Sequence, residues 1–334
     1  MHISSNLSKK ILAWYDNNKR SLPWRVGKNS SKRLYYRLLS EFMLQQTQVK
    51  TVIPYFKKFI TVFPNLKSLS KSSEIKILKL WEGLGYYRRA KNLLITSKIL
   101  VKKNNLKLPK KIHDIKKLPG IGDYTANALL ALVHDMPTIA IDGNVKRVFS
   151  RILNKNENKI NFEKLVLINK KRLFITKRNS DFVEAMMEFG ALICKPREPE
   201  CFKCDIKNIC KYFKTKKKFN SYNKLKIIEK SYDVFCYLKK NKKEIALTKK
   251  NTLGFLDKFN LPIIKETSIR NKNKDWSFLC NYKNSISNKR LNINLYYKFS
   301  NKIPSSFNWY SLNKNKEFIP TFTKKIFKQV SNLY

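Results

Sequence analysis

The sequence predicts a mainly α-helical N-terminal part followed by a C-terminal α+β domain. Apolar residues recur at helical spacing from Leu7 to about Tyr212, whereas short β-rich runs begin near Ser231. A basic stretch that contains several asparagines, residues 211–230, separates the two patterns. With 334 residues, the chain is long enough to form two domains.

Two segments of the N-terminal part have the apolar spacing of amphipathic helices. Their apolar side chains recur three or four residues apart, which places them on one face of a helix. The positions are Leu38, Leu39, Phe42 and Met43 in the first segment, and Ile75, Leu78, Trp81 and Leu84 in the second. Each set is expected to form a buried stripe.

Residues 118–126, Leu-Pro-Gly-Ile-Gly-Asp-Tyr-Thr-Ala, indicate a tight turn between two helices. Glycine tolerates the positive φ of such a turn, so Gly120 and Gly122 would let the N–H groups of the next helix face outward. Those donors and the helix dipole suit a phosphate group. An ordinary glycine-containing connection is the alternative, and Asp123 would oppose an anion unless it points away or caps the helix.

Four of the six cysteines form one cluster with the spacing C-x6-C-x2-C-x5-C. They are Cys194, Cys201, Cys204 and Cys210. Clustered thiols in a cytosolic chain are metal ligands more often than disulfides. Four thiolates fit either tetrahedral zinc or an iron–sulfur cluster, and the spacing alone leaves both open.

The C-terminal part contains runs that alternate or concentrate apolar side chains, as strands do. The clearest are residues 232–238 and 291–297, and the second alternates apolar residues with asparagine. The two remaining cysteines, Cys236 and Cys280, lie in such apolar surroundings and are expected to be buried structural thiols.

The chain carries 71 lysines and arginines against 23 aspartates and glutamates, a formal net charge of +48. A charge this positive attracts polyanions, and nucleic acid is the usual partner. The alternative is compositional, because a chain rich in Lys, Asn and Ile also arises from an AT-biased genome. The sequence has no apolar run of about 18 residues and no signal-peptide core. A soluble, intracellular protein without membrane contact is expected.

Taken together, these residues resemble adenine DNA glycosylases of the MutY type, a family in the helix-hairpin-helix superfamily. Each segment that carries the resemblance is weak alone, but the segments follow one another in the family's order. They are Leu22-Pro23-Trp24, residues 40–49, Gly83 to Tyr87, the hairpin at 118–126, Asp142 to Arg147, and the four clustered cysteines.

The resemblance implies a catalytic region at 1–213. This region would hold a six-helix barrel at roughly 28–136 and a cluster-bearing helical domain made of 1–27 and 137–213. It implies that the four cysteines hold a 4Fe-4S cluster. Residues 214–230 would be a linker, and 231–334 a Nudix-like domain that helps recognise 8-oxoguanine. The implied partner is double-stranded DNA with adenine opposite 8-oxoguanine or guanine, bound by a monomer in the bacterial cytoplasm, in association with the nucleoid.

Removing adenine breaks a glycosidic bond, which requires one carboxyl held protonated and another held ionised. Glu41, among apolar neighbours, is expected to have a raised pKa and to act as the acid, an exposed helix glutamate being the alternative. Asp142 is expected to stabilise the positive sugar, and Asn144 to hydrogen-bond and orient it. An aspartate at this place also fits a helix N-cap.

Tyr124 separates this chain from endonuclease III-type enzymes, which the chain also resembles and which carry a lysine there to form a Schiff base. A phenol cannot form that imine, so base excision without efficient strand cleavage is expected, with Tyr124 supporting the transition state. Lys146 leaves adventitious imine chemistry open. An oxidised-pyrimidine glycosylase with lyase activity and a non-catalytic iron–sulfur DNA-binding protein are the alternatives.

The resemblance also implies residues that extrude and hold the target base. Gln46 and Tyr86 would fill or wedge the base stack. The adenine pocket would be lined by Arg20, Leu22, Trp24 and Glu184. For Trp24 and Tyr86 the alternative is an ordinary core aromatic, which the residue types alone favour.

The C-terminal part departs from the family's pattern at the loop that meets the damaged guanine. Family members present Phe-Ser-His there, whereas the corresponding residues of this chain are Ile286, Ser287 and Asn288. Only the serine, Ser287, remains for guanine contact. Discrimination for 8-oxoguanine is therefore expected to be weaker.

Overall fold

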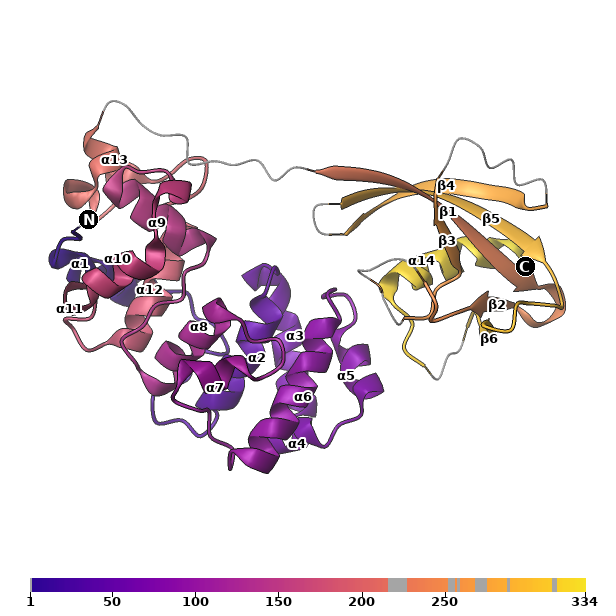
Figure 1. The fold of residues 1–334 in the computed structure, drawn as a ribbon, viewed down its shortest axis with the longest axis horizontal. Coiled ribbons are helices and arrows are strands. Elements are labelled where there is room, and N and C mark those ends of the chain that lie inside the picture. Colours follow the sequence, from indigo (N-terminus) through magenta and orange to yellow (C-terminus); the bar gives the residue numbers. More distant parts are fainter. Residues whose placement is uncertain are drawn as a thin grey trace. The chain divides into compact units, whose positions relative to one another are not determined.

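A computed structural model describes residues 2–215, 227–251, 256, 259–267, 275–286, 289–313 and 317–334. The chain divides into two compact units, one of residues 1–80 and 87–223, the other of residues 81–86 and 224–334. In Figure 1 the described part of the first unit is helical, and the second is built on a β-sheet. In the described part of the chain, no helix combines the length and apolar character needed to cross a bilayer.

Seven α-helices follow one another between residues 33 and 134. They are α2 (Arg33–Leu44), α3 (Val49–Val62), α4 (Leu66–Ser70), α5 (Glu74–Trp81), α6 (Arg88–Lys103), α7 (Ile112–Lys116) and α8 (Asp123–His134). The first predicted stripe is confirmed, since all four of its residues are fully buried on α2. The second is partly wrong: Ile75 is 44% exposed, and α5 ends before Leu84, where Gly83 has a φ of 100°.

The remaining helices of the first unit come from both ends of its sequence. They are α1 (Asn6–Asn18), α9 (Gly143–Leu153), α10 (Phe162–Ile168), α11 (Lys170–Leu173), α12 (Asn179–Leu192) and α13 (Lys211–Lys214). Helix α1 shares one hydrophobic core with α9 and α12, in which Trp14 packs edge-on against Phe189 at 5.0 Å. The N-terminal helix therefore packs with helices more than 120 residues further along the chain.

The predicted turn between helices joins α7 to α8. Gly120 has a φ of 80°, and a Cβ atom there would lie 2.8 Å from the Phe42 ring, so this position requires glycine. The expectation of positive φ is wrong for Gly122, whose backbone is extended with a φ of −94°. Asp123 does not cap α8 but forms an ion pair with Lys116 at 2.5 Å, which offsets its charge.

In its described residues, the second unit is a mixed sheet with helix α14 (Thr321–Val330) packed on it (Figure 1). The strands are β1 (Ile228–Lys239), β2 (Glu244–Leu247), β3 (Ile263–Glu266), β4 (Ser277–Ile286), β5 (Lys289–Phe299) and β6 (Asn308–Ser311), in the order β4-β5-β1-β2-β6 with β3 beside β1. Strands β1 and β5 are parallel. Helix α14 contacts the sheet through Lys325, which donates to Asn284.

Both predicted strands are confirmed as parts of β1 and β5. Strand β1 begins at Ile228, so the last three residues of the expected linker belong to the sheet, where they pair with β5. Cys236 is fully buried as expected, but Cys280 is only partly buried because β4 lies at the edge of the sheet.

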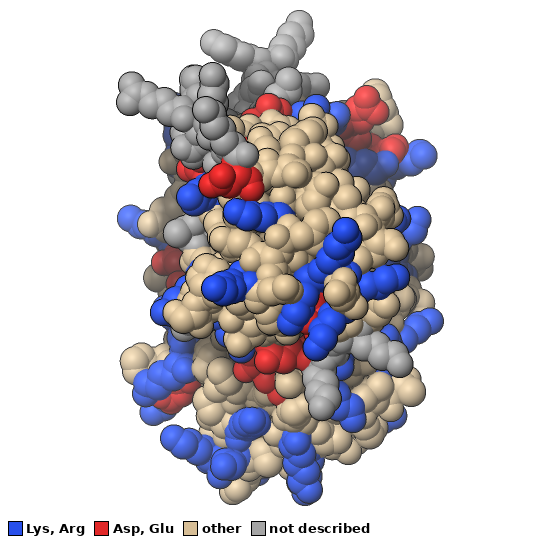
Figure 2. Space-filling view, turned by 90° about the vertical axis from the view of Figure 1, so that its right-hand side faces the viewer, with Lys and Arg blue, Asp and Glu red and all other residues tan. Residues whose placement is uncertain are grey.

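On the face seen in Figure 2, the positive charge is not gathered into one patch. Figure 2 shows lysines and arginines distributed across one face of the molecule, with acidic side chains among them. This distribution fits the compositional explanation for part of the net charge.

Candidate active site

Three ionisable side chains from three elements of the first unit influence one another electrostatically. Glu41 lies on α2, Tyr124 on α8, and Asp142 immediately before α9. Glu41 is only 5% exposed, and its Oε2 atom has no hydrogen-bond partner. Burial, together with the nearby carboxylates of Asp142 and Glu184, raises the pKa of Glu41 to about 7, against a lowering effect of Arg37. An exposed helix glutamate is therefore excluded.

Asp142 is held in place by hydrogen bonds to both of its carboxylate oxygens. It is the N-cap of α9, where Oδ1 accepts from the backbone N–H of Val145 at 2.7 Å. Asn144 Nδ2 donates to Oδ2 at 3.0 Å, the hydrogen bond that the sequence predicts. Burial raises the pKa of Asp142, while these hydrogen bonds favour the ionised form. The N-cap interpretation is thus correct, and it is compatible with a chemical role.

Arg147 and Gly190 fix Asn144 in turn. Arg147 Nη2 donates to Asn144 Oδ1 at 2.8 Å and to the Gly190 carbonyl at 2.7 Å. A Cβ atom at Gly190 would lie 2.6 Å from Asn144 Cβ, so glycine is what lets α12 approach the start of α9. The amide of Asn144 therefore has one orientation, with its nitrogen toward Asp142.

The phenol of Tyr124 is a neighbour of Glu41 and Asp142. Burial and the neighbouring Glu41 and Asp142 raise the pKa of Tyr124 well above its ordinary value, so the phenol stays protonated. Its hydroxyl lies 3.9 Å from Met187 Sδ. Lys146 lines, together with Tyr124, a hollow of about 650 Å³ beside α8 and α10. The Lys146 amine lies 5.8 Å from the centre of the Phe162 ring.

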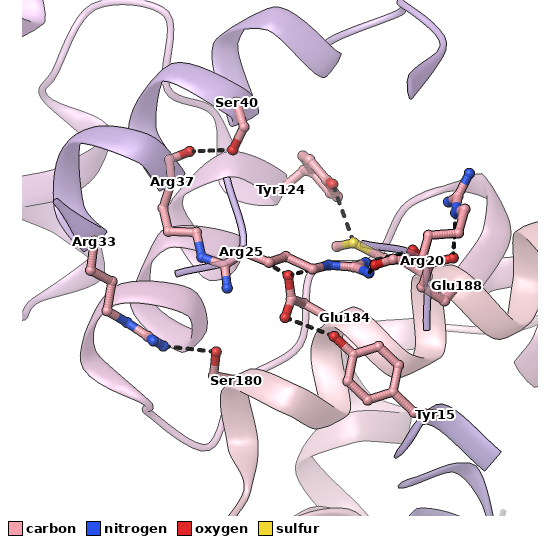
Figure 3. Close-up of polar contacts among 11 residues, drawn as sticks. Tyr15, Arg20, Arg25, Arg33, Arg37, Ser40, Tyr124, Ser180, Glu184 and Glu188 are labelled. Carbon is pink, nitrogen blue, oxygen red and sulfur yellow. Dashed lines mark hydrogen bonds and ion pairs between the residues drawn. The ribbon is translucent and has the colours of Figure 1, made fainter. Parts of the chain in front are cut away.

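A buried network of arginines and glutamates surrounds Glu184 on α12 (Figure 3). Glu184 Oε1 accepts from Arg25 at 2.9 Å and from Arg37 at 2.5 Å, and Oε2 accepts from the Tyr15 hydroxyl at 3.0 Å. Burial opposes the charge of Glu184, but Arg37 and Arg25 outweigh it and keep its pKa below the ordinary value. Glu184 is thus ionised, in contrast to Glu41.

Glu188, one helical turn after Glu184, extends this network. It accepts from Arg25 at 2.6 Å and from Arg20 at 2.8 Å (Figure 3). The sequence interpretation included Arg20 but missed Arg25, Arg37 and Glu188. Their spacing was an available signal, because Glu188 and Arg37 lie four residues from Glu184 and Glu41, on the same helix faces.

The other residues predicted to contact DNA differ in their burial and backbone conformation. Leu22 and Trp24 are buried, and Trp24 packs edge-on against Phe56, as a core aromatic does. Tyr86 is 41% exposed, which excludes a core role. Gln46 and Tyr86 both have left-handed backbones, with φ of 57° and 47°. Ser287 lies outside the described residues.

The four clustered cysteines line one pocket beside α9 and form no disulfide. Arg151 Nη1 donates to Cys194 Sγ at 3.4 Å, and the Cys210 thiol lies 3.4 Å from the Arg151 carbonyl. Burial and the three other thiols raise the pKa of Cys204 to about 12. Since only thiolates bind metals, a bound metal centre would have to supply the positive charge that ionises these groups.

This donor set fits an iron–sulfur cluster, whose irons take thiolate ligands in a largely apolar setting. Ile152, Phe189 and Ile206 are among the apolar residues that line the same pocket. Among the described residues, no three or more His, Cys, Asp or Glu side chains are arranged to hold a single metal ion.

The sequence profile of the HhH-GPD superfamily of base excision DNA repair proteins matches residues 39–170. The adenine DNA glycosylase of Buchnera aphidicola subsp. Baizongia pistaciae is 38% identical, over 96% of this chain and 95% of that protein. The adenine DNA glycosylase of Homo sapiens is 34% identical, over 60% of this chain and 38% of that protein.

Solved structures resemble the helical part. A thermostable thymine-DNA glycosylase has a TM-score of 0.55 at 25% identity, covering 62% of this chain and 94% of that chain. Endonuclease III in a non-covalent complex with DNA has a TM-score of 0.50 at 20% identity, which shows the same fold. By its similarity to relatives over nearly its whole length, the chain belongs to the adenine DNA glycosylase family.

Proposed function

We propose that this protein hydrolyses the N-glycosidic bond of adenine mispaired with 8-oxoguanine or guanine in double-stranded DNA, as a step of base excision repair. The observation that carries the proposal is the difference between two buried carboxyls. Burial raises the pKa of both groups, that of Glu41 to about 7, but Asp142 accepts hydrogen bonds from Val145 and Asn144 that favour its charge. This division supplies a proton donor and an anion within one site.

In the proposed reaction, Glu41 donates a proton to the departing adenine, which leaves as a neutral base. The sugar develops positive charge, which the Asp142 carboxylate stabilises; water then adds to the sugar carbon, and the proton that it loses restores the acid form of Glu41. Asn144 keeps Asp142 oriented, and the neutral phenol of Tyr124 supports the transition state. Glu184, which two arginines hold ionised, is proposed to line the adenine pocket with Arg20, Leu22 and Trp24, as the resemblance implies.

We also propose that the protein removes the base without cutting the DNA strand efficiently. The position at which a lyase carries its lysine holds Tyr124, whose phenol cannot form an imine with the sugar. Gln46 and Tyr86 are proposed to enter the base stack, and Gly120 and Gly122 belong to the turn that is proposed to hold a phosphate.

We further propose that Cys194, Cys201, Cys204 and Cys210 hold a 4Fe-4S cluster, which would fix the loop between them to α9. Residues 231–334 are proposed as a Nudix-like domain that contacts the base opposite adenine through Ser287, after a catalytic region at 1–213. The proposed enzyme acts as a monomer in the bacterial cytoplasm.

Single-turnover incubation with four duplexes tests the proposal. They carry adenine opposite 8-oxoguanine, adenine opposite guanine, adenine opposite thymine, and thymine glycol opposite adenine. The proposal predicts that only the two mispaired adenine strands break, and only after alkali. Direct breakage of the thymine-glycol strand would favour the endonuclease III-type alternative, and no breakage of any strand would favour a non-catalytic binder.

A further inference from the structure

A buried arginine on α6 forms several hydrogen bonds to the turn that carries Gln46. Arg89 is 7% exposed, and its Nη1 atom donates to the carbonyls of Phe42, Met43 and Gln45 at 3.2, 2.8 and 2.5 Å. Its Nη2 atom donates to Thr47 Oγ1 at 3.1 Å. The guanidinium therefore bonds both the last turn of α2 and the segment after it.

The turn to which Arg89 bonds has an unfavourable backbone conformation. Gln46 has a φ of 57°, in the left-handed region that residues other than glycine adopt only when their surroundings hold them there. Gln45 and Thr47, the residues on either side, both bond to Arg89. The hydrogen bonds of Arg89 therefore flank the residue whose left-handed backbone needs to be stabilised by its surroundings.

The same face of α6 also contacts the turn between α7 and α8. Thr96 Oγ1 donates to the Pro119 carbonyl at 3.0 Å, and Asn92 lies where a Cβ atom at Gly120 would clash. Arg89, Asn92 and Thr96 are spaced by three and four residues, so they form one stripe along the helix. The two turns also touch directly, because Gln45 Nε2 donates to the Gly120 carbonyl at 3.2 Å.

We infer that Arg89 is a positioning residue that sets the Gln46 turn at a fixed distance from the Gly120 turn. This inference rests on the proposed function, in which one turn holds a phosphate and the other enters the base stack. A phosphate and the base stack of a duplex are rigidly connected, so a wedge is effective only at the right separation from the phosphate contact. Arg89 acts through Gln46 and does not itself touch the reacting atoms.

The test separates DNA binding from extrusion of the base. A duplex carries 2-aminopurine on a 2′-fluoro sugar opposite 8-oxoguanine, at the position of the target adenine. The fluorine prevents cleavage by destabilising positive charge on the sugar, and 2-aminopurine brightens when it leaves the stack. Stopped-flow fluorescence gives the rate of extrusion, and equilibrium titration gives the affinity.

We expect Arg89→Met to slow the fluorescence rise by about 100-fold, the scale of an ångström-level misplacement, while affinity stays near that of the wild type. Arg89→Lys should recover part of the rate, because an ammonium can reach some of the carbonyls but lacks the planar fork. The control Lys98→Gln removes the same charge from an exposed position of α6 and should behave as the wild type.

An unchanged rate of extrusion in Arg89→Met would overturn the inference, as would a loss of affinity equal to the loss of rate. If Arg89→Met does not fold, Thr47→Val removes the acceptor of Nη2, together with the long 3.5 Å hydrogen bond from Thr47 Oγ1 to the Gln45 carbonyl, and an unchanged rate in that variant would overturn the inference equally. Wild-type excision of adenine from the unmodified duplex is measured first. Failure there would refute the proposed function, whereas normal extrusion in the variants of an active enzyme refutes only the role of Arg89.

Discussion

Replacing Glu41 with glutamine should increase the stability of the protein, relative to the wild type, as the pH rises from 5 to 7, while removing its activity. In the folded protein the pKa of Glu41 is about 7, against 4.5 for an ordinary glutamate. The folded state therefore binds this proton more tightly than the unfolded chain does. The stability from Glu41 is fully present below pH 4.5 and is lost as the pH rises toward 7. Glutamine has the same shape and does not titrate.

The size of this effect follows from the shift. At 1.36 kcal/mol per pKa unit, a shift from 4.5 to about 7 corresponds to about 3 kcal/mol. Because Glu41 is only 5% exposed, solvent screening reduces this figure little. The quantity to compare is the unfolding free energy of Glu41→Gln minus that of the wild type. Relative to its value well below pH 4.5, this difference should be larger by roughly 1 kcal/mol at pH 5 and by about 3 kcal/mol at pH 7, and should rise little beyond pH 7.

Urea unfolding at pH 5, 6, 7 and 8, followed by far-ultraviolet circular dichroism, measures this difference. Any cost of placing an amide where Oε2 lacks a partner shifts all four values equally and leaves the pH dependence intact. Glu163→Gln, at an exposed position of α10, is the control and should give no such trend. A difference between Glu41→Gln and the wild type that stays constant from pH 5 to 8 would refute the raised pKa.

Three further substitutions test other parts of the site. Asp142→Asn should abolish excision while duplex affinity, measured by fluorescence anisotropy, stays within a few fold, because charge is lost and volume is kept; near-wild-type excision would contradict the assigned role. Gly190→Ala should lower the unfolding free energy by about 1–3 kcal/mol and slow excision, since its Cβ would lie 2.6 Å from Asn144 Cβ; an unchanged thermal midpoint and rate would show that α9 and α12 need no such close approach. Cys204→Ser should remove the brown colour and iron content together with DNA binding; a colourless wild type that contains zinc would overturn the cluster.

Much of the architecture could be predicted because its patterns are local. The stripe on α2, the strands within β1 and β5, and the positive φ of Gly120 follow from side-chain spacing and glycine chemistry. The errors were local too. Gly122 is an extended helix cap, and β1 begins earlier than the basic composition before it indicated, because pairing with β5 extends it.

The site was only partly predictable, because its charges are set by residues distant in the sequence. Glu41 and Asp142 were identified through their motifs, but the ionised state of Glu184 depends on Arg25 and Arg37, which lie 159 and 147 residues away. Likewise, Arg147 and Gly190 fix Asn144 only because α9 and α12 pack together. No periodicity of the chain encodes such contacts between helices.

The proton donated by Glu41 is the central element of the proposed chemistry, and the pH dependence of single-turnover excision tests it most directly. With a pKa of about 7, about half of Glu41 is protonated at pH 7 and about a tenth at pH 8. The rate constant for adenine opposite 8-oxoguanine should therefore fall about fivefold from pH 7 to 8 and about tenfold from pH 8 to 9. A rate constant that is level or rising from pH 7 to 9 would show that Glu41 does not donate the proton.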